Sequence, residues 1–541
     1  MGQLIARREG LKVLLAGAID KRPTGYRLDL RATDPATGKS IATATQDVKD
    51  KSQVLKAIAS MATRVREALG ESKTEMAKLA AAETVTAGSL DAMRAYARAQ
   101  ELSRANKIPE ALQAYQEAVA LDPQFGRAYA GMGSIYSNYF KQPEKAEANY
   151  QTAMKHLDRM TDREKYRTLG TYYLNVVRNY EKAVETYETL VRLYPADDVG
   201  HGNLALAYLL VGNLQRAVAE ERNALTIYPR NSLQRYNYAM YSMYAGDFST
   251  AIAEASRLLK ENPSFEVPLL PLALARLAQG DVSGTRDAYT QLGASGQQGA
   301  SLANLGQADL QMYFGHYREA VALLREGIAA DRKRGDMPAV AHKDAALAEA
   351  YLALGDRRRA ADAANEAAKL SRRESTLLPA ARVLLRTGHE DAAVKTAGDL
   401  ENMLQRHTTA YARLITGEIA SEHGRVGEAI EAFRDAQKRQ DSWFSRFLLG
   451  KAYVEAGHFA EAIAELELSV KRRGETTDVF FYDMPTLRYL PPVYYWLGRA
   501  QEGLGVTAEA RKSYEQFLNL RGDANPPDPL AVDVRRRVSV R

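Results

Sequence analysis

Residues 203–229 of the chain read NLALAYLLVGNLQRAVAEERNALTIYP, and residues 237–263 read NYAMYSMYAGDFSTAIAEASRLLKENP. The two stretches begin 34 residues apart, and both contain an alanine, a glycine, a second alanine five residues after the glycine, and a closing proline. Self-similarity at an interval of this length predicts that each copy is one supersecondary unit that stacks on its neighbours. The sequence therefore predicts a repeat protein.

The glycine and the second alanine recur together along most of the chain. Glycine permits the left-handed backbone of a turn that follows one helix, and alanine lets the next helix approach its partner closely. A further small residue precedes each second alanine by twelve positions, and a large side chain often follows it after four. These spacings predict two amphipathic helices per copy. The recurring pairs are Gly212/Ala217, Gly246/Ala251, Gly315/Ala320, Gly355/Ala360, Gly388/Ala393, Gly424/Ala429, Gly457/Ala462 and Gly505/Ala510.

This pattern, with its small-x-x-Tyr first helix, its Gly-x-x-x-x-Ala turn and its closing proline, resembles the tetratricopeptide repeat family. The resemblance implies a mainly α, superhelical solenoid of about twelve helix pairs between residues 90 and 522, and a role in binding other proteins. The sixth copy is irregular, because it has Thr285 in place of the alanine and two early prolines, Pro268 and Pro271. The expected second-alanine positions are Ala111, Ala146, Ala183, Ala217, Ala251, Thr285, Ala320, Ala360, Ala393, Ala429, Ala462 and Ala510.

We expect the array to form two parts, 89–292 and 300–522, followed by a tail at 523–541. Between the parts, residues 293–299 contain three glycines, which indicates a looser junction.

Residues 1–70 follow a different pattern, and a linker at 71–88 is expected after them. Apolar and alternating segments bounded by turn residues predict three strands, and helical spacing of apolar residues predicts one helix that ends at a glycine. The expected elements are strands at Leu11–Ile19, Tyr26–Thr33 and Ile41–Val48, a hairpin turn at Asp34–Gly38, and a helix from Val54 to Leu69.

This small α/β unit, followed by Ser89-Leu90-Asp91-Ala92-Met93-Arg94-Ala95-Tyr96 and then repeats, resembles a TolB-like module. Such modules lie after the membrane segment in certain bacterial eukaryotic-type serine/threonine kinases, and related ones precede repeats in some adenylate cyclases and winged-helix regulators. The resemblance implies a sensor or scaffold in signalling, or alternatively a fragment that regulates in cis an upstream kinase or cyclase domain absent from this chain. The sequence has no glycine-rich kinase loop, His-Arg-Asp or Asp-Phe-Gly motif, so we expect no enzyme activity.

Composition excludes several classes of protein. The chain of 541 residues is 46% hydrophobic and has no apolar run long enough for a membrane span. It contains no cysteine, which excludes disulfides, thiolate zinc sites and cysteine nucleophiles. The first residues do not have the pattern of a signal peptide, so no export signal is expected, and the sequence leaves the compartment and the oligomeric state open.

The charge balance and the motif search also favour binding of proteins. Lys and Arg total 73 against 67 Asp and Glu, a net charge of +6, which does not favour nucleic acid. The short basic clusters are either solvated turns or a patch for an acidic partner. Gly38-Lys39-Ser40 lacks the first glycine of a phosphate-binding loop and is interpreted as a turn. The eight histidines are dispersed, and neither a metal nor a cofactor is expected.

The predicted peptide-binding surface is the concave face, which the resemblance assigns to the first helix of each pair. Asn203 and Asn237 occupy the same position in successive copies, and an asparagine amide can both donate to and accept from an extended peptide backbone. Alternatively, both asparagines satisfy helix ends or neighbouring turns. The complete hypothetical set adds two arginines for an acidic peptide and two apolar contacts: Arg127, Arg167, Tyr236 and Met240.

An insertion between the last two copies is the second candidate surface. Ala462 and Ala510 are 48 residues apart, against the usual interval of 34, and the additional residues fall within 471–492. Long insertions in compact arrays are often functional, and this one is aromatic. It is expected either to pack against its own solenoid or to dock a partner through Phe480, Phe481, Tyr482 and Tyr489.

Overall fold

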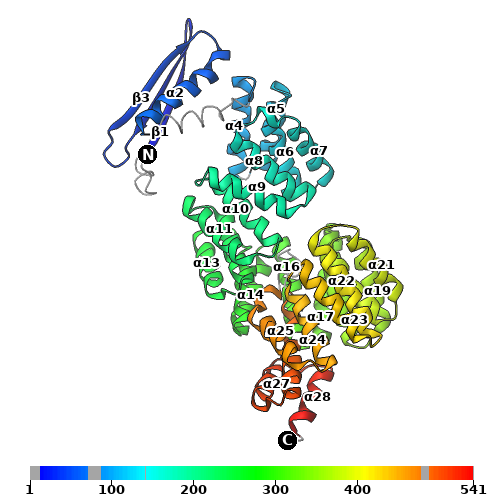
Figure 1. The fold of residues 1–541 in the computed structure, drawn as a ribbon. Helices are drawn as coiled ribbons and strands as arrows, with labels where there is room; N and C mark the ends of the chain where they lie inside the picture. The colour runs from blue at the N-terminus through cyan, green and yellow to red at the C-terminus, as the bar shows by residue number, and fades with distance from the viewer. Residues whose placement is uncertain (1–12, 71–86, 106, 141, 477–485, 540–541) are drawn as a thin grey trace. The chain divides into compact units, whose positions relative to one another are not determined.

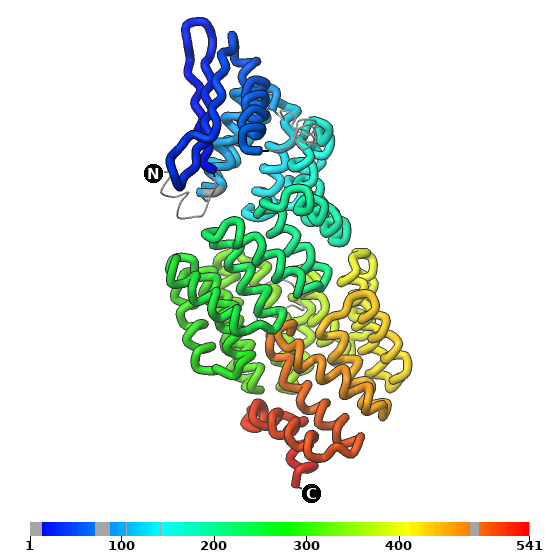
Figure 2. The backbone as a smooth tube through the Cα atoms, turned by 60° about the vertical axis from the view of Figure 1, so that its left-hand side comes forward, coloured from blue at the N-terminus to red at the C-terminus, as the bar shows by residue number. Residues whose placement is uncertain are grey.

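The computed structural model describes residues 13–70, 87–105, 107–140, 142–476 and 486–539. The chain divides into two compact units, Met1–Asn203 and Leu204–Arg541, and each is described by itself. Figure 1 shows the elements with their labels, and Figure 2 shows the backbone from a second direction.

The first unit begins with a three-stranded antiparallel sheet of order β1-β2-β3, formed by β1 (Leu14–Arg22), β2 (Gly25–Thr33) and β3 (Ser40–Val48). A short 3-10 helix, η1 (Lys51–Gln53), leads into α2 (Val54–Ala68), which packs on β2 and β3 (Figure 1). The buried side of α2 contacts a small core of apolar residues from those two strands. The predicted β-β-β-α unit is therefore confirmed.

The strand bounds differ from the expectation at β1. This strand continues to Arg22, beyond the expected end at Ile19, because it pairs with β2 up to the Arg22 and Gly25 positions around a tight turn. Residues 11 and 12, where the strand was expected to begin, lie outside the described residues.

Helix pairs follow in both units, as Figure 2 shows. The first unit contains α4 (Leu90–Arg104), α5 (Ile108–Leu121), α6 (Gly126–Asn138), α7 (Pro143–Met154), α8 (Asp162–Tyr172) and α9 (Tyr180–Leu193), with short helical turns η2 (Leu157–Arg159) and η3 (Tyr173–Val177). α10 (Asp198–Leu210) contains the division between the units.

The second unit continues with α11 (Leu214–Ile227), α12 (Ser232–Tyr244), α13 (Phe248–Glu261), α14 (Leu269–Ala278), α15 (Val282–Ala294), α16 (Gln297–Phe314), α17 (Tyr317–Arg334), α18 (Met337–Ala353), α19 (Arg357–Leu370), α20 (Glu374–Arg386), α21 (Glu390–Glu401), α22 (Arg406–Glu422), α23 (Val426–Arg439), α24 (Trp443–Ala456) and α25 (Phe459–Lys471). Its last elements are η4 (Arg473–Thr476), η6 (Leu487–Tyr489), α26 (Pro491–Gly503), α27 (Thr507–Arg521) and α28 (Pro529–Ser539). The glycine-rich residues 293–299 lie between α15 and α16, which pack on each other.

The second alanine of each copy is the fourth residue of the second helix in every pair of the described chain. The twelve residues at this position are at most 4% exposed. In the sixth pair, the hydroxyl of Thr285 donates to the carbonyl oxygen of Asp281 at 2.7 Å and lies 3.2 Å from that of Ala273 on the facing helix. The turn glycines have the expected left-handed backbone, as at Gly212 with φ 79° and Gly246 with φ 83°. The predicted solenoid and its register are therefore confirmed.

The first helices line the inner surface of the solenoid in the second unit. Successive first helices contact each other, as α16, α18, α20 and α22 do in turn, and α24 contacts α26. Helices on the concave side of a superhelix approach more closely than those on the outside. We call this side the inner surface.

The insertion after α25 folds back across the second unit and is here called the brace, residues 473–476 and 486–489. η4 contacts α12, α14 and α24, and η6 contacts α16. The Arg473 guanidinium donates to the carbonyl oxygen of Ala278 at 3.0 Å and lies over the ring of Phe248. A Cβ at Gly474 would overlap the carbonyl oxygen of Met243, so glycine is required by this close approach.

Two further contacts complete this arrangement. The hydroxyl of Thr486 donates to the carbonyl oxygen of Thr476 at 2.6 Å, which brings the two described parts of the brace together. At the end of α27, the guanidinium of Arg521 donates to the carbonyl oxygen of Tyr313 at 2.8 Å and pairs with Asp528.

The expected tail includes the helix α28. Within the described ranges, no helix is both long enough and apolar enough to span a membrane.

Candidate functional site

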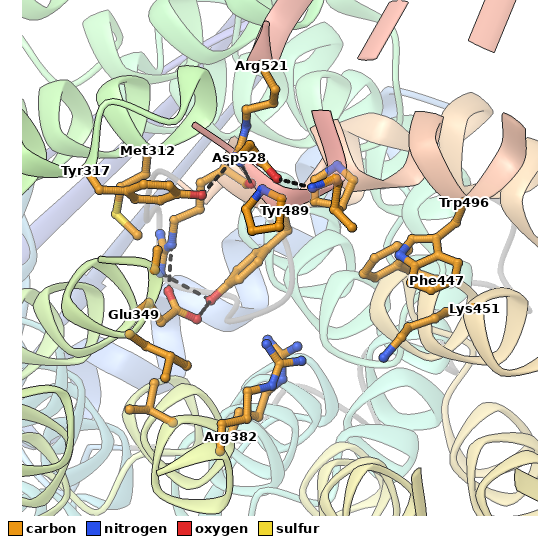
Figure 3. Close-up of a pocket in the computed structure, with 18 of the residues that line it drawn as sticks. Met312, Tyr317, Glu349, Arg382, Phe447, Lys451, Tyr489, Trp496, Arg521 and Asp528 are labelled. Atoms are coloured by element: carbon orange, nitrogen blue, oxygen red, sulfur yellow. Dashed lines mark hydrogen bonds and ion pairs between the residues drawn. The ribbon is translucent and has the colours of Figure 1, made fainter. Parts of the chain in front are cut away.

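The inner surface of the second unit encloses a cavity of about 530 Å³. Its lining comes from eight helices, together with η6 and the segment between α27 and α28 (Figure 3). The helices are α16, α17, α18, α20, α24, α26, α27 and α28. The lining combines cationic side chains with aromatic rings and prolines.

Three cations surround one buried carboxylate on one wall. Arg382 donates from Nε to Glu418 at 2.7 Å, and Arg386 lies 3.6 Å from the same carboxylate. Lys451 is the third cation, and its nearest ion pair, with Glu455, is 3.5 Å long. Burial opposes ionisation of Glu418, but the charges of Arg382, Arg386 and Lys451 outweigh it and lower the pKa of this carboxyl.

Arg386 and Lys451 retain unused donor groups. Neither side chain donates a hydrogen bond to any residue of the described chain, and both are partly exposed. In Figure 3, the amino group of Lys451 and the guanidinium of Arg382 point into the open space of the cavity. This wall can therefore accept an additional anionic group.

Aromatic rings lie beside these cations. The amino group of Lys451 is 5.6 Å from the centre of the Trp496 ring, and the guanidinium of Arg382 is 4.5 Å from that of Phe444. Phe447 lines the cavity next to Trp496 (Figure 3), and Pro492 also belongs to the lining. An apolar group that enters next to an anion would find a hydrophobic surface here.

The brace holds the wall that adjoins Arg382. Arg488 pairs with Asp309 at 3.0 Å and with Glu349 at 2.8 Å, and the hydroxyl of Tyr489 donates to Glu349 at 2.7 Å. Burial raises the pKa of Tyr489. Burial also raises the pKa of Asp309, although the charge of Arg488 opposes this shift. Tyr489, which the sequence singled out as a docking residue, therefore forms part of the cavity wall.

The two carboxylates in the lining are both engaged. Glu349 accepts from Arg488 and Tyr489, and Asp528 accepts from Arg521. The described residues contain no cluster of side chains suited to a metal ion. The groups that remain available in the cavity are cationic donors and apolar surfaces, which are suited to binding a ligand.

The other residues expected in a peptide groove are engaged within their own units. In the first unit, Arg127 donates to Thr168 at 2.9 Å, and Arg167 donates through Nε to the buried Asp197 at 2.8 Å. Burial opposes ionisation of Asp197, but the bonds from Arg167 outweigh it and lower its pKa. Asn203 lies beside the hydroxyl of Tyr187 on the preceding second helix.

In the second unit, Tyr236 and Met240 are buried, with Tyr236 edge-on to the ring of Phe265. Asn237 lies beside Glu221, sixteen positions earlier, which is the relation that Asn203 has to Tyr187. Both asparagines thus lie beside a side chain of a neighbouring helix, and the peptide contact proposed for them stays a prediction. Phe480, Phe481 and Tyr482 lie outside the described residues.

The sequence analysis did not single out Arg382, Arg386, Lys451 or Trp496. A signal for two of them is present, because the position directly after the small residue of the first helix is charged in six successive pairs. In the structure, charges at this position meet on the inner surface, as Arg382 and Glu418 do. The six residues are Asp309, Glu349, Arg382, Glu418, Lys451 and Arg499.

The tetratricopeptide repeat family is detected directly in the chain. Sequence models described as tetratricopeptide repeat match residues 96–153 and 171–232, and a second such model matches residues 493–523. The chain therefore contains tetratricopeptide repeats, arranged as a helical solenoid. No support emerged for a likeness between residues 1–70 and the kinase-associated module. No curated protein matches the chain.

Several solved structures are similar in fold. The Cut9–Hcn1 hetero-tetramer of the APC/C is 15% identical, with 90% of this chain and 81% of that chain covered and a TM-score of 0.42. PilW, a type IV pilus biogenesis factor, is 18% identical, with 38% and 92% covered and a TM-score of 0.31. Human IFIT1 with PPP-AAAA is 15% identical, with 73% and 90% covered and a TM-score of 0.37.

Proposed function

We propose that the chain is a non-enzymatic interaction scaffold, and that the cavity of its second unit holds a segment of a partner protein. An acidic group of that segment lies between Arg386 and Lys451, and a neighbouring apolar side chain contacts Trp496 and Phe447. The observation that carries this proposal is the presence of two cavity-lining cations with no hydrogen bond of their own in the described chain.

The dimensions and electrostatics of the cavity support such a ligand. A volume of about 530 Å³ is in the range of ligand pockets and accommodates a few side chains. Charge-assisted hydrogen bonds to a carboxylate are about twice as strong as neutral ones, and the surrounding aromatic rings reduce competition from water. Glu418 neutralises Arg382 most directly, so the additional anion is expected nearer to Arg386 and Lys451.

The first test is selection of a random peptide library on the immobilised full chain, followed by anisotropy measurements with the enriched peptides. Acidic sequences with an adjacent aromatic, aliphatic or proline residue should be enriched. Lys451→Met and Arg386→Met should each weaken binding by roughly tenfold, because each removes a charged partner of the ligand. Binding should also weaken as salt concentration increases.

The control is Arg358→Met, which removes an arginine that is 86% exposed on α19. This variant should bind like the wild type. A charge reversal provides a second criterion, since Lys451→Glu should shift selection away from acidic peptides. Peptides that bind the wild type and all four variants equally would refute the assignment of the cavity, and so would a library that yields no enriched sequence.

A further inference from the structure

The outer edge of β1 has no partner strand in the described part of the chain. β1 pairs along its length with β2, whereas α2 packs on β2 and β3. All of β1 after Leu14 is exposed, and its first six residues, 14–19, carry no charge. Free strand edges are normally blocked by charges, proline or a bulge, and an edge without these devices accepts another strand.

The opposite edge of the sheet differs from β1. β3 presents polar residues such as Thr43, Thr45 and Asp47, and its pairing with β2 is irregular between Ala32 and Thr33. A register irregularity and polar side chains both discourage additional pairing. Of the two edges, β1 is therefore the one suited to accept a strand.

The apolar face of the sheet continues from β2 onto β1, beyond the residues on which α2 packs. Leu28 and Ala32 of β2 are buried beneath α2, and their partners on β1 are Ile19 and Leu15. Residues opposite each other in a sheet share a face, so Leu15 and Ile19 continue the apolar face. Nevertheless Leu15 is 58% exposed and Ile19 is 40% exposed.

We propose that a second copy of this chain pairs with β1 in an antiparallel arrangement, about a twofold axis at Gly17, and joins the two sheets into one of six strands. This register sets Leu15 opposite Ile19 of the second copy, and Ile19 opposite its Leu15. A register centred on Ala18 would instead set Leu15 opposite Lys21. The Gly17 register therefore keeps the apolar face continuous from one β2 to the other.

The centre of this register also fits the packing around Gly17. Leu30 is the partner of Gly17 on β2, and its Cδ1 is 3.8 Å from the position that a Cβ of Gly17 would occupy. Leu30 thus extends over the glycine toward the free edge. Two glycines opposite each other leave space for Leu30 from both copies.

Charges on the other face are complementary in the same register. Arg31 is opposite Ala16, and Asp29 is opposite Ala18. Pairing about Gly17 sets Ala16 opposite Ala18 of the second copy. Arg31 of the first copy and Asp29 of the second copy therefore lie in one row across four strands, with the two alanines between them. Three strand spacings separate their Cα atoms by about 14 Å, so the two opposite charges attract each other across the alanines without a direct ion pair.

Arg31 is available for this interaction. It is exposed, and it forms neither an ion pair nor a hydrogen bond with another residue of the described chain. Asp29 accepts a hydrogen bond from Thr45 and lies 3.5 Å from Arg27. A single strand edge buries less than the roughly 1,200–2,000 Å² of a standard interface, so the dimer is expected to be weak, in the micromolar range.

Sedimentation velocity of the full chain over a series of micromolar concentrations tests the proposal. The wild type should dimerise, and the double variant Leu15→Lys/Ile19→Lys should remain monomeric with an unchanged circular dichroism spectrum, because both positions are exposed in the monomer. Leu404→Lys is the matched control, since Leu404 is 84% exposed in the second unit, and it should dimerise like the wild type.

Two further experiments examine the register. Arg31→Glu should weaken the dimer, and the charge exchange Arg31→Glu/Asp29→Arg should restore it. Because the chain has no cysteine, Gly17→Cys introduces a single thiol at the proposed axis. Oxidation with diamide should link Gly17→Cys into a covalent dimer and leave Leu404→Cys largely unlinked.

Three results would overturn the proposal. They are a wild type that is monomeric at the highest concentration, a dimer that the β1 variants do not affect, and a wild type that stays monomeric while a variant lacking residues 1–12 dimerises. The last result would assign the edge to those residues.

Discussion

Glu221 occupies a position that five other helix pairs fill with tyrosine and one fills with phenylalanine. Tyr187 is its counterpart in the preceding pair, where the hydroxyl bonds to Thr171 at 2.8 Å. Glu221 is completely buried, and neither of its carboxylate oxygens has a hydrogen-bond partner in the described chain. Burial raises its pKa to about 8, although the amide of Asn237 opposes the shift.

This raised pKa makes stability depend on pH. Between the ordinary value of 4.5 and about 8, the unfolded chain ionises Glu221 while the folded chain keeps it protonated. The free energy of unfolding should therefore decrease as pH increases through this range, by on the order of a few kcal/mol, and stay constant above it. Glu221→Gln should remove this decrease in the free energy of unfolding, because glutamine does not ionise.

Thermal unfolding followed by circular dichroism from pH 5 to pH 9 provides the measurement. The melting temperature of Glu221→Gln should exceed that of the wild type by an amount that increases with pH and levels off near pH 8. Glu220→Gln removes a carboxylate from the same helix and serves as the control. A difference between Glu221→Gln and the wild type that does not change with pH would contradict the buried, protonated state.

At the scale of the helix pair, the alanine at the fourth position of each second helix determines how closely the two helices pack. Ala217 in α11 is completely buried, whereas Ala219, two residues later, is exposed. Ala217→Trp should overpack the pair and reduce the free energy of unfolding by about 1–3 kcal/mol or more. Ala219→Trp introduces the same side chain into the same helix at the surface.

Urea unfolding of the two variants distinguishes packing from helix propensity. Both substitutions change propensity in the same way, so only the packing effect should separate them. Ala219→Trp should stay within about 0.5 kcal/mol of the wild type. Equal stability of the two variants would mean that the repeat register is wrong.

The helix pairs could be predicted from the sequence because their determinants are local. Gly212 and Ala217 are five residues apart, and together they specify a turn and a close helix contact. The brace could not be predicted in the same way, since the requirement for glycine at Gly474 arises from the carbonyl of Met243, which is distant in sequence. The long interval between the last two copies showed that an insertion is present, but it did not show which helices the insertion contacts.

The candidate site was predicted less well than the fold. Asn203 and Asn237 were correctly placed on first helices, but an asparagine there can face a partner or a neighbouring helix, and spacing alone does not distinguish the two. The cavity joins residues from eight helices and the brace, so its outline depends on the curvature of the solenoid. The sequence shows that the position of Arg382 and Lys451 is charged in successive pairs, but it does not show where in the fold these charges lie.

At the scale of the second unit, the brace links helices that are far apart in the array. Gly474→Ala should separate η4 from α12, because the new methyl group and the Met243 carbonyl cannot occupy the same space. We expect a loss of about 1–3 kcal/mol of stability. Hydrogen exchange should become faster at both contacting segments, the C-terminal end of α12 and residues 473–476.

Gly398→Ala is the control for this substitution. Gly398 lies within α21, and the position of its missing Cβ has no neighbouring atom within 4 Å. Alanine is favoured over glycine inside a helix by about 1 kcal/mol, so this variant should be slightly more stable than the wild type. Faster exchange confined to residues 473–476 in Gly474→Ala, without a change in α12, would contradict the proposed linkage.

The brace also fixes the number of helix pairs in the second unit. An open solenoid can gain or lose a pair at any point, since each pair contacts only its neighbours. Here η4 returns to α12 and α14, so the helices from α12 to α25 form a closed circuit. Adding or deleting one pair within the circuit would displace Gly474 from the Met243 carbonyl. A natural or designed variant can therefore change its length on the N-terminal side of α12, whereas inside the circuit the brace must be rebuilt at the same time.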